Sequence, residues 1–247
     1  SIINYLNGVR VLHLYAGYDF KVLQSFEYKL LTKGLTRLKQ HRVRRAAAIT
    51  PVILLDLVRE MDLSDNLVLA CWLSYLIAFF LMSRKANLVP TSLNKFDPTK
   101  HLTRGNIVLV DSGLWINIVW SKTNQYGDRI LQVPVPRIHG SPLCPIRAYE
   151  RLISIVPAHS SDPAFTYALK PKLRTVTQYL FVKVLREHLH KAGYNASSFT
   201  GHSFRRGGAT FAFAAGVPGE LIQIHGDWAS RSEEHTSELQ SHSDLVC

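Results

Sequence analysis

The sequence contains little cysteine, and its cysteines lie far apart. Only three occur among 247 residues, at Cys71, Cys144 and Cys247, and no two of them form a CxxC pair. Disulfide frameworks and cysteine-based zinc sites both depend on several cysteines at characteristic spacings. We therefore expect no disulfide framework and no metal site, in a protein that folds in a reducing compartment around a hydrophobic core.

A hydrophobic run long enough to span a membrane is also missing. The most apolar stretch, residues 67–82, has 16 residues and is interrupted by Ser74 and Tyr75. A bilayer-spanning helix needs about 20 apolar residues. This favours a buried core helix over a membrane segment. The chain begins without methionine, which is typical of a fragment, and its start does not resemble a signal peptide.

Acidic residues are scarce relative to basic ones. Eighteen Asp and Glu face 29 Lys and Arg, which gives a net charge of +11 and a pI near 9.7. Such an excess suits nucleic acid first and an acidic membrane surface second, although a basic protein can also be merely soluble. A basic run ends in Arg42, Arg44 and Arg45. We expect it to contact phosphates, the alternative being a solvated surface.

The spacing of apolar residues predicts a mostly helical chain with one small sheet. Residues 2–44 are apolar at helical spacing, and Thr50-Pro51 is typical of a helix start. We expect a linker at 46–50 and further helices up to about Arg84. The pattern then predicts strands and, after them, helices, in this order: strands at 107–110, 114–120 and 129–133, and helices at 145–156, 175–191 and 204–215.

The most informative local motif is Gly201-His202-Ser203-Phe204-Arg205-Arg206, followed by Gly226-Asp227-Trp228. His202 and Arg205 are three residues apart at a helix start, so their side chains share one face. A helix N-terminus with an arginine can bind an anion, and a histidine can transfer a proton near neutral pH. Alone, this pair is a weak signal, because a capping histidine beside a surface arginine is commoner.

Three further segments make the motif specific. Met82-Ser83-Arg84-Lys85 ends the apolar run, Trp120-Ser121-Lys122-Thr123 ends a predicted strand, and Trp228 follows Arg205 by 23 residues. This order resembles the tyrosine recombinases, the phage-integrase-like family. The segment HSFRRGGATFAFAAGVP and the GDW that follows it are similar to the corresponding sequences in recombinases of DIRS- and Ngaro-type retrotransposons and of Cryptons. The resemblance covers about residues 1–230.

The resemblance implies a fold and a division into domains. The fold is the mostly α (α+β) catalytic domain of tyrosine recombinases, with a small antiparallel sheet, at residues 51–230. A partial helical core-binding domain precedes it at residues 1–45. The implied activity is DNA recombination and integration for a transposable element, through a 3′-phosphotyrosyl intermediate and without a cofactor. The implied partners are double-stranded DNA and three further copies of the chain, with no membrane. The implied location is the nucleus for a eukaryotic element and otherwise intracellular.

The resemblance also implies roles for individual residues. Arg84 and Arg205 would hold the scissile phosphate, Lys122 would protonate the leaving oxygen, His202 would act as base or phosphate ligand, and Trp228 would orient the phosphate. Three of these residues have alternative interpretations. Arg84 could be only a cation that stabilises a helix C-terminus, and Trp228 could be a core residue. Lys122 could be a solvated lysine, with Lys85 binding the phosphate in its place. Lys85 and Arg206 are further candidates for DNA contact. His225 is out of register and is expected to support the site or to be incidental.

The sequence departs from the family at its end. The nucleophilic tyrosine should follow shortly after Trp228, but no tyrosine occurs after Tyr194. Residues 231–247 carry a net charge of −3, against +14 for the preceding 230 residues. Residues 231–241 resemble one reading frame of a sequencing adapter, so we expect a non-native, disordered tail. A natural polar tail is the alternative. The chain is therefore expected to be inactive as it stands; the alternative function is that of a non-catalytic DNA-binding protein derived from a recombinase.

Overall fold

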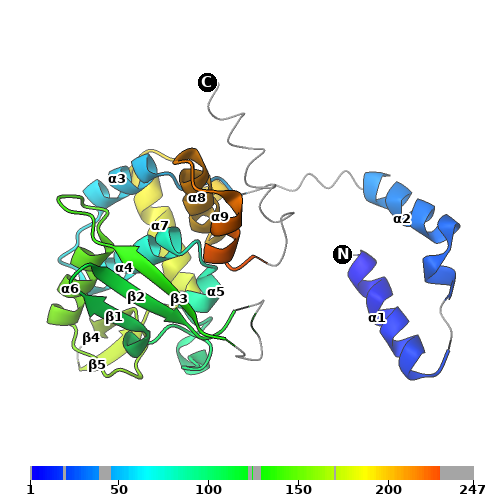
Figure 1. Ribbon diagram of the computed structural model, residues 1–247, viewed down its shortest axis with the longest axis horizontal. Coiled ribbons are helices and arrows are strands. Elements are labelled where there is room, and N and C mark those ends of the chain that lie inside the picture. The colour runs from blue at the N-terminus through cyan, green and yellow to red at the C-terminus, as the bar shows by residue number, and fades with distance from the viewer. Residues whose placement is uncertain are drawn as a thin grey trace. The chain divides into compact units, whose positions relative to one another are not determined.

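The computed structural model describes residues 2–18, 21–38, 46–121, 124, 129–169 and 171–228. The chain divides into two compact units, Ser1–Arg45 and Ala46–Cys247. The first unit contains α1 (Ile2–Tyr15), η1 (Lys21–Gln24) and α2 (Phe26–Leu38) (Figure 1). None of the described side chains of this unit is buried. Its apolar residues, such as Leu12 and Leu30, are exposed, as expected for a unit too small to enclose a core of its own.

The second unit begins with an extended segment, residues 46–50, which packs against the unit's later part. Ile49 is fully buried, its N–H donates to the carbonyl of Ser203 at 3.0 Å, and the N–H of Ala47 donates to Ser198 at 2.8 Å. The segment, which the sequence predicted to be a linker, belongs to the second unit. Its small and apolar side chains let the backbone lie directly against the helix that begins at His202.

Two helix starts follow from local chemistry. The hydroxyl of Thr50 accepts a hydrogen bond from the N–H of Ile53 at 3.3 Å, with Pro51 in the first turn of α3 (Pro51–Glu60). The carboxylate of Asp65 accepts two backbone N–H bonds at the start of α4 (Asn66–Phe80). Both arrangements satisfy amides that a helix start leaves without partners.

Helix α4 is the centre of the second unit. Its residues 69–79 are all buried, and it packs against α6 (Pro145–Ile155), α7 (Gln178–Lys191), α8 (His202–Ala214) and β4 (Thr166–Leu169). The phenol of Tyr75 donates to the carbonyl of Phe181 at 2.8 Å and stacks on Phe204, with ring centroids 5.0 Å apart. The apolar run is thus a core helix, and no helix in the described part of the chain is both long and apolar enough to cross a membrane.

In the described part of the chain, five strands form two antiparallel sheets. The larger has the order β1 (Ile107–Val110), β2 (Gly113–Ile118), β3 (Leu131–Pro136) and buries Ile116, Val133 and Val135 on one face. The smaller is the hairpin of β4 and β5 (Lys172–Thr175). The sequence had predicted only one sheet, and a helix from 175. In the structure α7 begins three residues later, after its N-cap Thr177.

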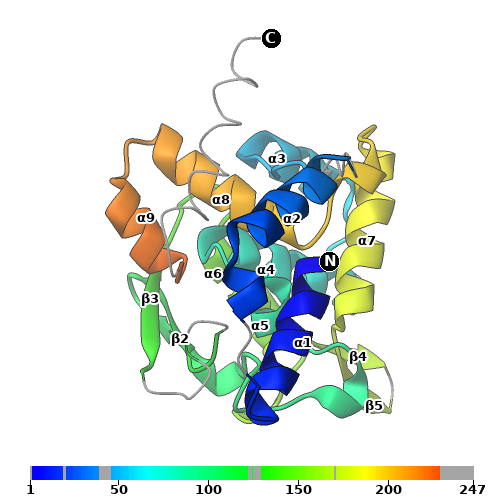
Figure 2. The same cartoon turned by 90° about the vertical axis from the view of Figure 1, so that its right-hand side faces the viewer.

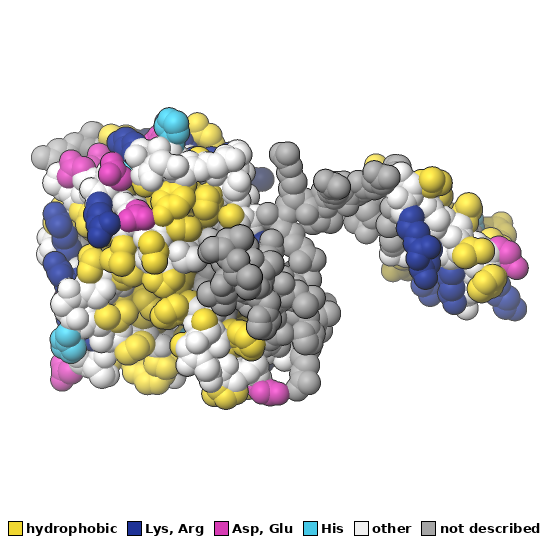
Figure 3. All heavy atoms as spheres, turned by 90° about the horizontal axis from the view of Figure 1, so that it is seen from above, with side chains coloured by type: hydrophobic (Ala, Val, Ile, Leu, Met, Phe, Trp, Pro, Cys, Tyr) yellow, Lys and Arg dark blue, Asp and Glu magenta, His cyan; other side chains and the backbone are white. Residues whose placement is uncertain are grey.

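The remaining elements are short. They are α5 (Lys85–Leu88), η2 (Leu93–Lys95), η3 (Arg104–Asn106), η4 (Ala196–Ser198) and α9 (Gly219–His225). In both Figure 1 and Figure 2, α8 and α9 lie side by side. Figure 3 shows hydrophobic side chains gathered on one face of the second unit. Helices α8 and α9 each expose large apolar side chains, among them Phe211, Phe213, Leu221 and Ile224.

Candidate functional site

Arg205 is the best-fixed charged residue of the site. It lies in the first turn of α8 and is only 7% exposed. Its Nη1 donates to two carbonyl oxygens, of Met82 and of Gly226, both at 2.7 Å. Charged hydrogen bonds of this kind compensate the burial of a guanidinium. Arg205 thereby joins the end of α4 to the end of α9, two segments far apart in the sequence.

Trp228 lies directly beside this guanidinium. The Cζ of Arg205 is 4.3 Å from the centroid of the tryptophan ring, which is a cation–π contact, and Trp228 is 8% exposed. Gly226 leaves room for the ring, since a Cβ there would come within 2.8 Å of it. Trp228 is therefore buried, as a core tryptophan would be, and also touches Arg205, whereas its contact with a phosphate stays a prediction.

Arg84 and Lys85 approach Arg205 from the end of α4. Arg84 is the N-cap residue of α5 and is partly buried. It lines a small cavity together with Arg205. Lys85 runs alongside the start of α8, where a Cβ on Gly201 would come within 2.4 Å of the lysine Cδ. The two arginines and Lys85 therefore belong to one basic site, although 120 residues separate them in the sequence.

His202 stands at the edge of this group of cations. His202 is exposed, and its backbone N–H donates to Thr200 Oγ1 at 3.2 Å. Partial burial of the imidazole lowers the pKa of His202. The positive charges of Arg84, Arg205 and Lys85 lower it further, in that order. At neutral pH the imidazole is therefore held neutral, the form that can accept a proton or a hydrogen bond.

The other residues predicted to bind DNA or to act on it are Lys122, the basic run Arg42, Arg44 and Arg45, and Arg206. Lys122 and the basic run lie outside the described residues, whereas Arg206 contacts the protein itself. The guanidinium of Arg206 donates from Nη1 to the carbonyl of Ala46. This contact fastens α8 to the extended segment, so one role of Arg206 is to hold the fold around the site.

Two glycines that sequence reasoning passed over allow this packing. A Cβ on Gly207 would lie 1.8 Å from the carbonyl oxygen of Ile49, and a Cβ on Gly208 would lie 2.2 Å from that of Phe79. Helix α8 can approach both backbones only without side chains at these positions. Consecutive glycines destabilise a helix by themselves. Their presence at 207 and 208 could therefore have indicated that the helix lies close to another backbone.

His225, which the sequence left as supporting or incidental, supports the site. Its Nε2 lies 2.7 Å from the carbonyl oxygen of Phe80, in the last turn of α4. His225 also lines the cavity between Arg84 and Arg205. Since the carbonyl can only accept, Nε2 is the donor and must carry a proton. This hydrogen bond connects the C-terminal end of α9 with the C-terminal end of α4.

Asp227, between Gly226 and Trp228 in the sequence, contacts residues of the connection between β2 and β3. Its Oδ2 accepts a hydrogen bond from the hydroxyl of Ser121, and its Oδ1 lies 2.5 Å from Nη2 of Arg129. Its φ is +52°, in a region that few residues other than glycine adopt. Nothing in the sequence pattern alone had indicated this contact.

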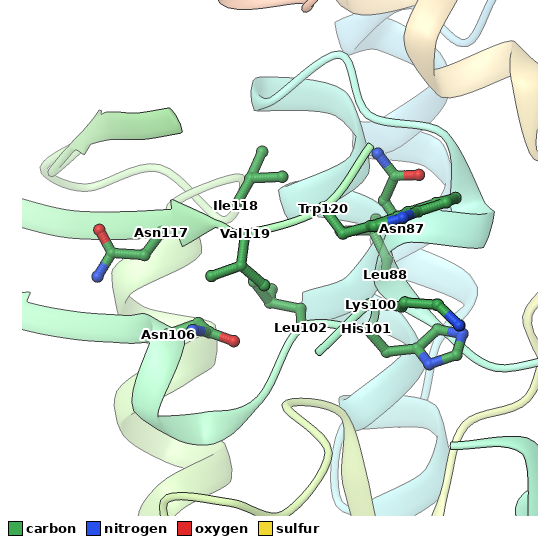
Figure 4. Close-up of a pocket in the computed structure, with 10 residues that line it drawn as sticks. All are labelled: Asn87, Leu88, Lys100, His101, Leu102, Asn106, Asn117, Ile118, Val119 and Trp120. Carbon is green, nitrogen blue, oxygen red and sulfur yellow. The ribbon is translucent and has the colours of Figure 1, made fainter. Parts of the chain in front are cut away.

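A second small pocket lies next to the site (Figure 4). Asn87 and Trp120 line it, the first from α5 and the second from the end of β2, together with Lys100 and His101. Burial lowers the pKa of His101. The pocket has room for no more than about one water molecule. No group of three His, Cys, Asp or Glu residues within the described ranges is placed to hold a metal ion.

The chain was compared with known proteins. No protein-family model and no curated protein matches it. Solved structures do match. XerH site-specific recombinase bound to difH substrate, in a pre-cleavage complex, has a TM-score of 0.56 and 16% identity over 78% of this chain and 50% of its own. The post-cleavage complex with palindromic difH has a TM-score of 0.57 and 15% identity, with 81% and 51% covered.

A further match is a tryptophan-to-phenylalanine mutant of Flpe in complex with a DNA Holliday junction. Its TM-score is 0.50 and its identity 12%, with 88% of this chain and 57% of that one covered. The chain thus spans about half the length of these structures. At such identities the likeness concerns the fold. It confirms the fold class predicted from the sequence: the chain has the fold of the tyrosine recombinases.

Proposed function

We propose that this chain is the catalytic core of a DNA-strand-transferring tyrosine recombinase of a mobile element, of the DIRS, Ngaro or Crypton type. The observation that carries the proposal is the meeting of Arg84 and Arg205 at one cavity, with Trp228 against the second arginine and a neutral His202 beside both. Two arginines that line one cavity suit a phosphodiester, whose negative charge grows in the transition state. Of the structures that share the fold, XerH is described as bound to its difH substrate and the Flpe mutant as a complex with a DNA Holliday junction.

In this proposal each residue acts on the phosphate through its own chemistry. Arg84 and Arg205 neutralise the non-bridging oxygens, and the indole N–H of Trp228 donates to one of them. Lys122 gives its proton to the 5′ oxygen as the phosphorus–oxygen bond breaks, and neutral His202 receives the proton of the attacking hydroxyl. A metal ion is not required where arginines supply the positive charge.

The attacking hydroxyl is what the chain lacks. The last tyrosine, Tyr194, donates its hydroxyl hydrogen bond to Asp56 at 2.7 Å, and that bond raises its pKa. A phenol held in this way, with its ionised form disfavoured, is a poor nucleophile. The proposal is therefore that the chain binds DNA and activates a phosphate without itself forming a covalent bond.

A test supplies the nucleophile from solution. Duplex DNA is first selected from random sequence by retention on the chain, then end-labelled and incubated with the chain and hydrogen peroxide. The peroxide oxygen would bond to phosphorus while the bond to the 5′ oxygen breaks, and Lys122 would protonate that oxygen. We expect cleavage that leaves a free 5′ hydroxyl and that falls at least tenfold in Arg84→Ala. Arg147→Ala, an exposed arginine of α6, is the control of equal charge and should cleave normally.

The same assay separates the alternative function. DNA binding without any peroxide-dependent cleavage would support a non-catalytic DNA-binding protein derived from a recombinase. Cleavage that is unaffected by Arg84→Ala would contradict the assignment of the site.

We also propose that the intact protein assembles as a tetramer on DNA and acts in the nucleus of its host. The apolar side chains that α8 and α9 expose, Phe211, Phe213, Leu221 and Ile224, support a contact with another copy. Light scattering of the chain mixed with its selected DNA, compared with the chain alone, tests the assembly. A single copy per DNA site at all concentrations would contradict it.

A further inference from the structure

Helix α4 ends in a turn that is usually built around a glycine. The N–H of Met82 donates to the carbonyl of Phe79, and the N–H of Ser83 donates to the carbonyl of Ala78, both at 3.1 Å. These two hydrogen bonds form a Schellman motif, which places a left-handed residue just after the helix. Met82 occupies that position with a φ of +48°. Since a Cβ strains this backbone, a methionine here indicates that its side chain has a use of its own.

The backbone of Met82 holds one of the two arginines of the site. Its carbonyl accepts a hydrogen bond from Nη1 of Arg205 at 2.7 Å. Arg84, which lines the cavity together with Arg205, follows two residues later in the chain. The left-handed turn thus ends α4 and directs a carbonyl towards Arg205. A glycine would do both without strain, so these backbone contacts do not account for the methionine.

The side chain of Met82 is buried among the residues around Trp228. It is 6% exposed and belongs to a small apolar cluster, separate from the main core, whose other buried members are Ala209 of α8, Ile222 of α9 and Trp228. Its Cγ lies close to α8, since a Cβ on Gly208 would come within 3.1 Å of it. Methionine suits such a gap, because it is flexible and its sulfur makes favourable contacts with aromatic rings.

Two kinds of contact hold Trp228. The guanidinium of Arg205 lies over its ring, with Cζ 4.3 Å from the ring centroid, and the small apolar cluster surrounds its buried part. Close packing is what limits a buried side chain to one rotamer. Another rotamer of Trp228 would carry the indole N–H away from a phosphate oxygen bound by Arg205. The apolar cluster therefore decides whether this N–H can reach the phosphate.

We infer that Met82 is a positioning residue, whose side chain holds the indole of Trp228 in the orientation that binds the scissile phosphate. The inference rests on the proposed function, since it concerns the hydrogen bond from Trp228 to the phosphate in that reaction. It goes beyond the predicted phosphate-binding residues, because the buried side chain of Met82 acts only through Trp228. It also accounts for a methionine at a position whose backbone favours glycine.

The decisive experiment measures peroxide-dependent cleavage at saturating DNA for Met82→Gly, alone and combined with Trp228→Ala. The glycine keeps the left-handed backbone and the carbonyl that Arg205 needs, and removes only the side chain. We expect Met82→Gly to slow cleavage about tenfold, which corresponds to the loss of one hydrogen bond to a charged group. In a chain that already carries Trp228→Ala, the same change should slow cleavage by less than about twofold. No slowing by Met82→Gly alone, or the same slowing in both backgrounds, overturns the inference.

Met61 provides the matched control. It is the other of the chain's two methionines and is also 6% exposed, but it follows α3 and packs in the main core. Met61→Gly should lower the stability in urea, whereas the folded chain should cleave DNA at an unchanged rate. Met82→Leu fills a similar volume and should recover most of the rate that Met82→Gly loses. Equal slowing by Met61→Gly, or no recovery with leucine, contradicts the inference.

A second measurement does not depend on cleavage. A chain labelled at its methionine methyl groups gives one NMR signal for each of its two methionines, and Met61→Leu identifies the signal of Met61. Because an aromatic ring shifts the resonance of a methyl group that lies against it, Trp228→Ala should move the Met82 signal and leave that of Met61 in place. An unmoved Met82 signal overturns the inference by itself. A moved signal in a chain that does not cleave DNA would instead uphold the contact with Trp228 and contradict the proposed function.

Discussion

Replacing Arg205 with methionine should destabilise the second unit strongly. The change keeps a long side chain against Trp228 but removes both hydrogen bonds from Nη1, to Met82 and to Gly226. A hydrogen bond to a charged group is worth about 1.5–3 kcal/mol, and the cation–π contact adds about 0.5–2 kcal/mol. Relief of the guanidinium's desolvation offsets part of this. We expect a net loss of about 2–4 kcal/mol.

The loss can be measured by urea denaturation followed by tryptophan fluorescence. All four tryptophans lie in the second unit, so the signal reports on that unit. With a urea m-value of about 2–3 kcal/mol per molar, the midpoint should fall by about 1–2 M. Arg147→Met, at an exposed position of α6, should change the free energy of unfolding by no more than about 0.5 kcal/mol. A loss below about 1 kcal/mol for Arg205→Met, with the same m-value, would refute this reasoning.

Three further predictions concern packing, proton binding and DNA. Gly208→Ala should destabilise the second unit by about 1–3 kcal/mol through overpacking, because the added Cβ would collide with the Phe79 carbonyl; a neutral or stabilising result in the same urea titration would contradict the close approach of α8 to α4. The imidazole of His202 should titrate by NMR with a midpoint below the usual 6.5 or so, since its folded-state pKa is lowered. The unfolded chain then binds this proton more readily, so the contribution to stability is lost as the pH falls through 6.5 toward the folded pKa. Arg84→Ala should raise the midpoint, and an unchanged midpoint would argue against proximity of the two residues. Neutralising Arg42, Arg44 and Arg45 together should reduce the slope of log affinity for duplex DNA against log salt by about two to three units; an unchanged slope would identify that run as a solvated surface.

Much of the second unit could be predicted because its signals are local. The apolar run at 67–82 gave the buried helix α4, and Thr50-Pro51 gave the start of α3. Alternation and turn residues located β1 and β2 to within two residues. Each signal depends on neighbours within one helical turn or one strand, which the sequence displays directly.

The predictions failed where short segments depend on distant partners. The hairpin of β4 and β5 has strands of four residues, too short for a clear period. Residues 46–50 were predicted as a linker, but their packing depends on a distant residue, because the backbone of Ile49 can lie against α8 only where Gly207 has no side chain. In both cases packing, rather than local propensity, decided the structure.

The sequence by itself determined which residues are the candidates for the chemistry: an HxxR pair at a helix start, an arginine ending a core helix, and a tryptophan beyond. Only the tertiary structure decided that they form one site. Arg205 reaches the carbonyl of Met82 across 123 positions, and Ser121 reaches Asp227 across 106. The physical reason is that local preferences act over a few residues, whereas such contacts exist only once the core has packed and brought the ends of α4, β2 and α9 together.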